Sequence, residues 1–240
     1  DKVITLPPTY GMYAVLADLN AVENIEILLE EDFQPNKNKI SRSADGQTKL
    51  LFLCSPNNPT ANSFKAKHIE WLIEDFRGIV VIDEAYIDFS KDDSWLDRLN
   101  EFPNLIVTQT LSKAYGLAGI RLGVCYASKE IITVLNKIKP PYNINELTQA
   151  KALERLNRMD SVQIEVAHVL KERKKLKMAL KSIELVQKVY PSDANFLLVK
   201  VDDANKRYLQ LVEKSIVVRN RTNQPLCENC LRLTVGTEYE

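Results

Sequence analysis

One lysine of the chain stands among hydroxyl, glycine and arginine residues. Lys113 follows Thr110 and Ser112, and Arg121 comes eight residues after it. Hydroxyls, backbone N–H groups and a guanidinium can together hold a phosphate group. A lysine amine inside such a cradle can form a Schiff base once desolvation and nearby charges lower its pKa. The alternative is a solvated surface lysine, which is the usual state of a lysine in a loop.

Two carboxylates follow a short apolar run. Asp83 and Glu84 come directly after Ile79–Ile82, which has the length and composition of a buried strand. Ligands of open α/β sheets bind at the carboxyl ends of such strands. Asp83 could cap the following turn, belong to a nucleotide hydrolase, or face the ring nitrogen of a bound cofactor. The second possibility lacks its partner, because the chain contains no G-x-x-x-x-G-K-[ST] stretch.

Glycine is scarce except near Lys113. The chain has seven glycines, and Gly116, Gly119 and Gly123 fall within eight residues of each other. Glycine tolerates left-handed dihedrals and close backbone approach. We therefore expect one or both of these features just after Lys113.

A Schiff-base lysine, a phosphate cradle and a strand-end aspartate together describe a site for pyridoxal 5'-phosphate (PLP). With these residues the sequence resembles the fold-type I PLP-dependent aminotransferases, and among them the histidinol-phosphate aminotransferases. Matching stretches run in family order along nearly the whole chain: Pro7–Tyr13, Cys54–Thr60, Asp83–Tyr86, Thr110–Gly123, Arg219–Arg221 and Cys230–Gly236. Ala61 departs from the pattern, since the family usually has glycine there, and the turn is expected to differ slightly.

The resemblance implies a role for each matching residue. Lys113 is the catalytic lysine, which binds the cofactor and then moves the proton of the reaction, and Asp83 pairs with the ring nitrogen. The other implied cofactor contacts are Asn58 and Tyr86 for the ring O3′, Tyr10 for stacking on the ring, and Ser112 and Arg121 for the phosphate. Arg219 and Arg232 are implied to bind the anionic end of the substrate.

The implied reaction is transamination of L-histidinol phosphate with 2-oxoglutarate, giving imidazole acetol phosphate and L-glutamate in histidine biosynthesis. One arginine pair can serve both substrates, because the guanidinium fork pairs with phosphate or carboxylate. Two relatives on the same scaffold remain as alternatives, an aromatic amino acid aminotransferase and a threonine-phosphate decarboxylase. The resemblance also implies a homodimer. A non-catalytic interaction domain would leave the residues around Lys113 unexplained.

Other chemical motifs are weaker. Cys227 and Cys230 have the spacing of half a zinc site, but the chain has only two histidines, His68 and His168. We therefore expect no metal site. Cys54 and Cys125 stand in apolar runs, which predicts buried thiols.

Alternating apolar runs and amphipathic stretches predict an α/β fold with a mainly parallel sheet flanked by helices, and a smaller α+β unit near the C-terminus. The predicted strands of the first part are Val3–Leu6, Ile25–Leu29, Leu50–Cys54, Ile79–Asp83, Leu105–Thr108 and Leu122–Ala127. Helices are expected at Tyr10–Leu19, at Lys65–Phe76 with Ser63 as N-cap, and from Ser128. The segment from Leu28 to Ile40 is expected to be a surface loop.

Pro140 and Pro141 interrupt the chain and mark a hinge. We therefore expect a large PLP-binding domain over 1–140, a linker helix region over 141–157 and a small C-terminal domain over 158–240. The small domain is predicted to contain a long charged helix, Met159–Ile183, and strands that include Ile216–Arg219 and Cys230–Val235. The family resemblance places further residues before Asp1, so the N-terminal part of the large domain is expected to be missing from this sequence.

The overall composition excludes several classes of protein. The 240 residues include 32 Lys and Arg against 32 Asp and Glu, so the net charge is zero. This balance argues against a nucleic-acid or membrane-surface partner, which normally requires a basic excess. No apolar run approaches the roughly 18 residues of a membrane span. Without a secretory signal, four cysteines indicate a reduced cytoplasmic protein.

Overall fold

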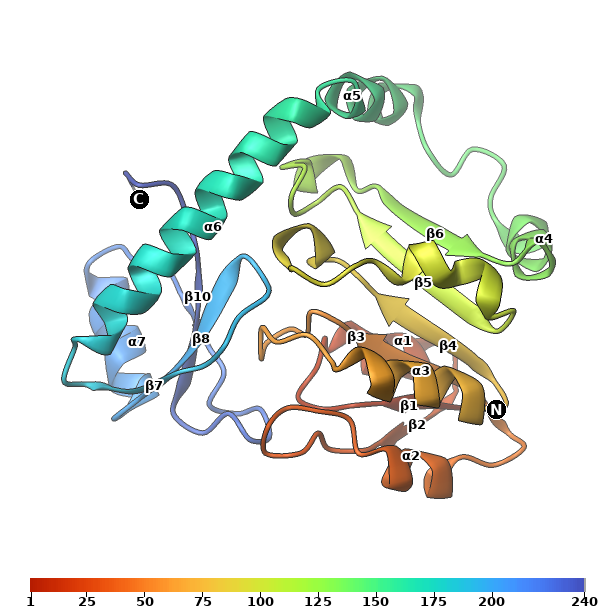
Figure 1. Cartoon of the computed structure of the whole chain (residues 1–240), viewed down its shortest axis with the longest axis horizontal. Coiled ribbons are helices and arrows are strands. Elements are labelled where there is room, and N and C mark those ends of the chain that lie inside the picture. The colour runs from red at the N-terminus through yellow and green to blue at the C-terminus, as the bar shows by residue number, and fades with distance from the viewer. Residues whose placement is uncertain (240) are drawn as a thin grey trace.

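A six-stranded sheet forms the first part of the computed structural model, which describes residues 1–239 (Figure 1). Its strand order is β2-β1-β3-β4-β5-β6, with β1 to β5 parallel and β6 antiparallel to β5. The strands are β1 (Lys2–Thr5), β2 (Glu23–Glu26), β3 (Thr48–Cys54), β4 (Ile79–Asp83), β5 (Leu105–Thr110) and β6 (Gly123–Ala127). The predicted mainly parallel sheet is confirmed.

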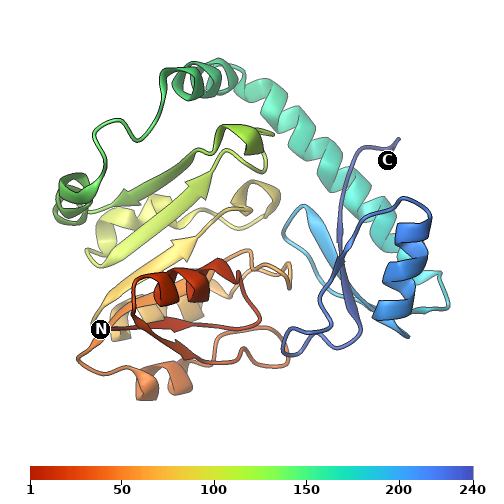
Figure 2. The same ribbon diagram turned by 180° about the vertical axis from the view of Figure 1, so that it is seen from behind.

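Helices cover both faces of this sheet. Figure 1 shows α3 (Ala66–Asp75) in front of the sheet, and Figure 2, from behind, shows α1 (Met12–Leu19) on the opposite face. Because both faces are covered, the central strands carry continuous apolar runs rather than alternating ones. The remaining helical segments of this part are α2 (Lys37–Ser43), α4 (Lys129–Ile138) and three short 3₁₀ helices, η1 (Ile87–Phe89), η2 (Trp95–Glu101) and η3 (Ala118–Ile120).

The segment from Leu28 to Ile40 is not the surface loop that its polar composition predicts. Leu29, Phe33 and Ile40 are buried in the main core, with at most 4% of each side chain exposed. Helix α2 also begins inside this segment, where the Asn36 side chain accepts a hydrogen bond from the backbone N–H of Lys39 at 2.8 Å. The three apolar residues stand among acidic, amide and lysine residues, so no continuous apolar run marked them as core residues.

Two smaller predictions are also wrong. Ser63 does not cap α3, because the helix begins at Ala66 and its N-cap is Lys65, which makes no side-chain hydrogen bond. The Ser63 N–H instead binds Oδ2 of Asp193 at 2.9 Å, which joins two distant parts of the chain. Cys125 is exposed rather than buried, because β6 is the edge strand of the sheet.

A four-stranded antiparallel sheet forms the second part, in the order β7-β8-β10-β9. Its strands are β7 (Val186–Val189), β8 (Phe196–Val201), β9 (Arg219–Asn220) and β10 (Cys230–Thr234), and α7 (Ala204–Glu213) packs on it. Helix α5 (Glu146–Leu156) and the long α6 (Met159–Lys181) run from the first sheet to the second (Figure 1). The strand predicted at 216–219 is only the two residues of β9.

The two faces of the second sheet have different neighbours. Leu197, Val199 and Leu231 belong to a core with residues of α6 and α7, whereas Leu198 and Cys230 belong to the main core of the first part. This is the two-residue alternation of β-strands. It directs the even-numbered residues of β8 and β10 toward the first sheet.

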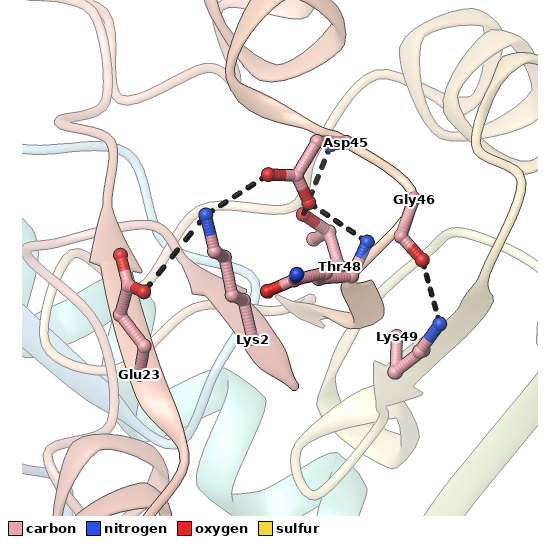
Figure 3. A network of polar contacts seen from close by, with 7 residues as sticks. Lys2, Glu23, Asp45, Gly46, Thr48 and Lys49 are labelled. Carbon is pink, nitrogen blue, oxygen red and sulfur yellow. Dashed lines mark hydrogen bonds and ion pairs between the residues drawn. The ribbon is translucent and has the colours of Figure 1, made fainter.

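A polar network holds the edge of the first sheet that lies opposite its carboxyl ends (Figure 3). Lys2 at the start of β1 pairs with Asp45 at 2.9 Å and with Glu23 at 3.9 Å. Asp45 also accepts hydrogen bonds from the N–H of Gln47 and the hydroxyl of Thr48. These contacts join the starts of three adjacent strands.

No helix within residues 1–239 is long and apolar enough to cross a membrane.

Candidate active site

A cavity of about 290 Å³ lies where β3, β4 and β5 end. Tyr10, which follows β1, closes one side of it. The cavity contains all seven residues predicted to contact the cofactor, namely Tyr10, Asn58, Asp83, Tyr86, Ser112, Lys113 and Arg121. Cys54, Ala85, Thr108, Gln109 and Thr110 complete its lining. The parallel order of the strands therefore gathers residues that are far apart in sequence.

Asp83 lies on the cavity wall with a hydrogen bond to each carboxylate oxygen. Oδ1 accepts from the N–H of Ala85 at 3.0 Å, so Asp83 does cap the turn after β4. Oδ2 accepts from the hydroxyl of Tyr13 at 2.6 Å. Burial raises the pKa of Asp83, while these two donors and the positive charge of Lys113 act in the opposite direction.

Glu84 points away from the cavity. Its carboxylate accepts hydrogen bonds from Ser94 Oγ at 2.5 Å, the N–H of Trp95 at 2.7 Å and Nε2 of Gln109 at 2.9 Å. Three donors satisfy a side chain that is 1% exposed. Glu84 thus fixes η2 against the sheet and takes no part in the cavity lining.

The loop after β3 is held by a buried amide. Asn57 is fully buried, and its side chain binds Thr9 Oγ1 at 2.9 Å, the carbonyl of Pro8 at 2.8 Å and Thr60 Oγ1 at 2.7 Å. These bonds join the β3 loop to the segment after β1. The next residue, Asn58, is thereby presented to the cavity, where its Oδ1 accepts from Nη1 of Arg232 at 2.5 Å.

The turn after Asn58 has the backbone conformation that glycine prefers. Ala61 takes φ 69°, in the left-handed region, and its N–H binds the carbonyl of Asn57 at 2.8 Å. The left-handed conformation costs an alanine roughly 1–2 kcal/mol. The Ala61 methyl is fully buried against Tyr86 and Phe196, which offsets part of that cost.

Lys113 stands between positive and aromatic groups. Desolvation lowers its pKa, and the charges of Arg232 and Arg121 lower it further, whereas Asp83 opposes them. The Lys113 Nζ is 5.3 Å from the centre of the Tyr86 ring. A lowered pKa increases the fraction of neutral amine, which is the nucleophilic and basic form.

The segment around Lys113 is shaped by local hydrogen bonds and by two of its glycines. The hydroxyls of Thr110 and Ser112 are 3.0 Å apart, and Thr110 Oγ1 also accepts from the Ser112 N–H at 3.1 Å. Gly116 takes φ +68°, and a Cβ at Gly123 would approach the Gln109 carbonyl to 3.3 Å. Both predicted reasons for glycine therefore occur here. Nothing in the structure explains Gly119, which has open space around it.

The three arginines of the second sheet occupy different positions. Arg232 is half-buried, reaches Asn58, and lies 4.8 Å from the centre of the Phe196 ring. Arg219 is paired with Arg232 across β9 and β10, but it is exposed and lies outside the cavity lining. Arg221, which had no predicted role, is half-buried, and its Nε has no hydrogen-bond partner.

Sequence reasoning missed Tyr13 and Asn57, which hold Asp83 and Asn58. Both belong to stretches that were recognised, but a supporting contact depends on packing between distant segments. One signal for Tyr13 was available, because it lies three residues after Tyr10, at helical spacing, in an apolar helix start.

A sequence profile described as Aminotransferase class I and II matches residues 1–240. The chain belongs to this aminotransferase family. Members of the family depend on PLP, so the protein is a PLP-dependent aminotransferase.

Curated relatives of this aminotransferase match it along its whole length. The histidinol-phosphate aminotransferases of Flavobacterium johnsoniae and Christiangramia forsetii are 63% and 61% identical to it over 240 residues. In both cases the match covers 100% of this chain and 69% of the relative. The crystal structure of the histidinol-phosphate aminotransferase from Clostridium acetobutylicum shares the fold, with a TM-score of 0.92 at 24% identity, covering 99% of this chain and 74% of that one.

The donor set of the cavity fits PLP. Asp83 offers a carboxylate to a ring nitrogen, and each of its oxygens has one protein donor, which leaves lone pairs available. Lys113 offers an amine, and hydroxyls with Arg121 offer donors for a phosphate. The volume, about 290 Å³, is near the lower end for small-molecule sites, roughly 300 Å³.

The cysteine pair of the second part does not form a metal site with other residues. Cys227 and Cys230 are both buried free thiols, and burial raises the pKa of Cys227 to about 12 and that of Cys230 to about 11. Within the described residues, no group of three or more His, Cys, Asp or Glu side chains is arranged to hold a metal ion. The two thiols instead pack in the main core.

Proposed function

We propose that this aminotransferase transfers the amino group of L-histidinol phosphate to 2-oxoglutarate, giving imidazole acetol phosphate and L-glutamate in histidine biosynthesis. Two facts support the substrate. Relatives of that name are 46–63% identical over the full chain. The observation that carries the proposal is the half-buried Arg232 guanidinium. It is not part of the cavity lining, but it donates to Asn58, which is, and a guanidinium in that position can bind an anion.

We propose that Lys113 is the catalytic residue. When bound, PLP supplies a carbonyl for the amino group and an electron-withdrawing ring that stabilises charge at the substrate Cα. The Lys113 Nζ, with its lowered pKa, is a suitable base for the Cα proton. Asp83, whose two hydrogen-bond donors favour its ionised form against the effect of burial, would keep a proton on the ring nitrogen.

The other cavity residues would bind and orient the cofactor. Tyr10 would cover a ring face, and Asn58 and Tyr86 would donate to the ring oxygen. Ser112 and Arg121 would hold the phosphate, where a charge-assisted contact is about twice as strong as a neutral one. Burial raises the pKa of Tyr86 to about 12, so its hydroxyl stays a donor at neutral pH.

Arg232 would bind the anionic end of both substrates in turn, a phosphate in one half-reaction and a carboxylate in the other. Arg219 is proposed as its partner in this role. Because Arg219 is exposed, its guanidinium must turn toward the substrate when the substrate binds.

We further propose a role for each segment of the chain, a cellular location and an oligomeric state. Residues 1–140 bind the cofactor, 141–157 link the two parts, and 158–240 supply the substrate arginines. The protein acts as a cytoplasmic homodimer, without nucleic-acid or membrane partners. Light scattering would measure the assembly directly.

Coupled assays with the PLP-loaded protein test the proposed substrate. Activity with histidinol phosphate, and much less with phenylalanine or threonine phosphate, is the expected result. Preference for phenylalanine would assign an aromatic aminotransferase instead. Release of carbon dioxide from threonine phosphate would assign a decarboxylase.

A further inference from the structure

A tyrosine outside the predicted site makes the shortest contact to Asp83. The Tyr13 hydroxyl donates to Asp83 Oδ2 at 2.6 Å, and the two residues are 70 positions apart in sequence. Tyr13 does not line the cavity. The Tyr13 hydroxyl therefore reaches the cavity only through the Asp83 carboxylate.

The Tyr13 ring is fixed from both sides. It stacks on Phe52 of β3, with ring centres 4.8 Å apart and an angle of 13° between the planes. Its other contact is with Tyr10, edge to face at 5.5 Å and 86°. Only 7% of the Tyr13 side chain is exposed. The hydroxyl thus has a defined position, and the same ring touches the residue proposed to stack on the cofactor.

Asp83 has few other partners. Besides Tyr13 on α1, the groups that face it are Cys54 at the end of β3, Tyr86 after β4, and Lys113 after β5. Lys113 is the one cation among them, and it is engaged elsewhere during the proposed reaction. A carboxylate in such an environment keeps its charge and its direction mainly through its hydrogen bonds.

We propose that Tyr13 is a positioning residue, whose hydrogen bond holds the Asp83 carboxylate so that its free lone pairs face the cavity and the cofactor ring, and favours the charged form of that carboxylate. This rests on the proposed role of Asp83 toward PLP. Since Tyr13 also contacts Tyr10, it connects Asp83 with the residue that is proposed to cover the face of the cofactor ring.

The test is Tyr13→Phe, which removes the hydroxyl and keeps the stacked ring. The dissociation constant for PLP, measured by fluorescence, should rise roughly tenfold, the usual effect of losing one bond to a charged group. The pH midpoint of the visible absorption of bound PLP should move to higher pH. The nitrogen that joins Lys113 to the cofactor holds its proton more tightly when a less positive ring nitrogen withdraws less electron density from it. A merely structural role would not move this midpoint. Tyr142→Phe is the matched control, because Tyr142 is 94% exposed.

A second variant separates this proposal from the role of Asp83. Asp83→Asn should itself weaken PLP binding, and adding Tyr13→Phe to it should then change little, because the two act through one contact. Full additivity of the two changes, or an unchanged midpoint in Tyr13→Phe, would overturn the role of Tyr13. If Asp83→Asn leaves PLP binding unchanged, the role of Asp83 fails instead. Thermal melts of each variant identify any loss of folding.

Discussion

Individual residues of the cavity differ in how far sequence could identify them. Lys113, Asp83 and Arg121 have side chains whose chemistry is visible in the sequence, and the cavity contains all three. The contacts of Asp83 with Tyr13 and of Asn58 with Arg232 were not predictable from the sequence. The first joins residues 70 positions apart, and the second joins residues 174 positions apart. Residue types suggest chemistry, whereas contacts depend on the fold.

Lys113→Ala should reduce transamination by about a thousandfold or more, because the amine both binds the cofactor and moves the proton. Single-turnover kinetics with each substrate measure this loss. Lys129→Ala, at the exposed start of α4, is the control and should keep normal activity. A Lys113→Ala enzyme with near-normal turnover would show that another residue is the catalytic lysine.

Arg232→Lys keeps the charge but removes the fork, so kcat/KM should fall roughly tenfold or more. Both half-reactions should weaken together, because the proposed site binds both substrates through this arginine. Separate measurement of the two half-reactions checks this, with Arg42→Lys on the exposed face of α2 as control. Loss confined to the 2-oxoglutarate half-reaction would indicate two distinct anion sites.

Among the elements, the central strands were predictable and the connections between them were not. Strands β3, β4 and β5 have apolar runs bounded by polar residues, and their predicted ends lie within two residues of the observed ones. The segment from Leu28 to Ile40 has no such apolar run, since its buried residues include Gln34 and Pro35 and are flanked by charged ones. Its burial depends on contacts with the rest of the main core.

A half-buried arginine of helix α6 contacts both parts of the chain. Arg173 Nη1 donates to the carbonyl of Ala194 at 2.6 Å and to that of Phe89 at 3.3 Å. Arg173→Met should lower the free energy of unfolding by about 1–3 kcal/mol, because the Phe89 carbonyl loses its bond from Arg173 and the Ala194 carbonyl keeps only the longer bond from Ser192 Oγ, at 3.2 Å. Denaturant unfolding measures the change, with Lys174→Met on the exposed side of the same helix as control. Equal stability of both variants would contradict a connecting role.

The network at the opposite sheet edge should give stability that depends on pH. The hydrogen bond from Lys2, with bonds from Gln47 and Thr48, lowers the pKa of Asp45 from 3.8 to about 2. A carboxyl group whose pKa is lowered by folding stabilises the fold at pH values above its pKa in the unfolded chain. This stabilisation is lost as the pH falls toward the folded-state pKa of about 2. Asp45→Asn should therefore melt at a slightly lower temperature at pH 7. The difference should shrink between pH 4 and 2 and with added salt, because Asp45 is exposed. A difference that is constant across this range would exclude the ionic contribution.

At the scale of the whole molecule, the candidate active site depends on both sheets. The first sheet supplies the cavity, and the alternation along β8 and β10 turns Arg232 toward it. The α/β class and the second, smaller sheet followed from the sequence pattern. The packing of one face of the second sheet onto the first part could not be predicted from the pattern, because it depends on long-range contacts such as those of Leu198 and Cys230.

The most direct test asks where PLP attaches. The protein is incubated with PLP, reduced with borohydride, digested and analysed by mass spectrometry. We expect a pyridoxyl group on Nζ of Lys113 and none in the Lys113→Ala variant. Labelling of a different lysine, or equal labelling of the variant, would contradict the assignment of this cavity as the active site.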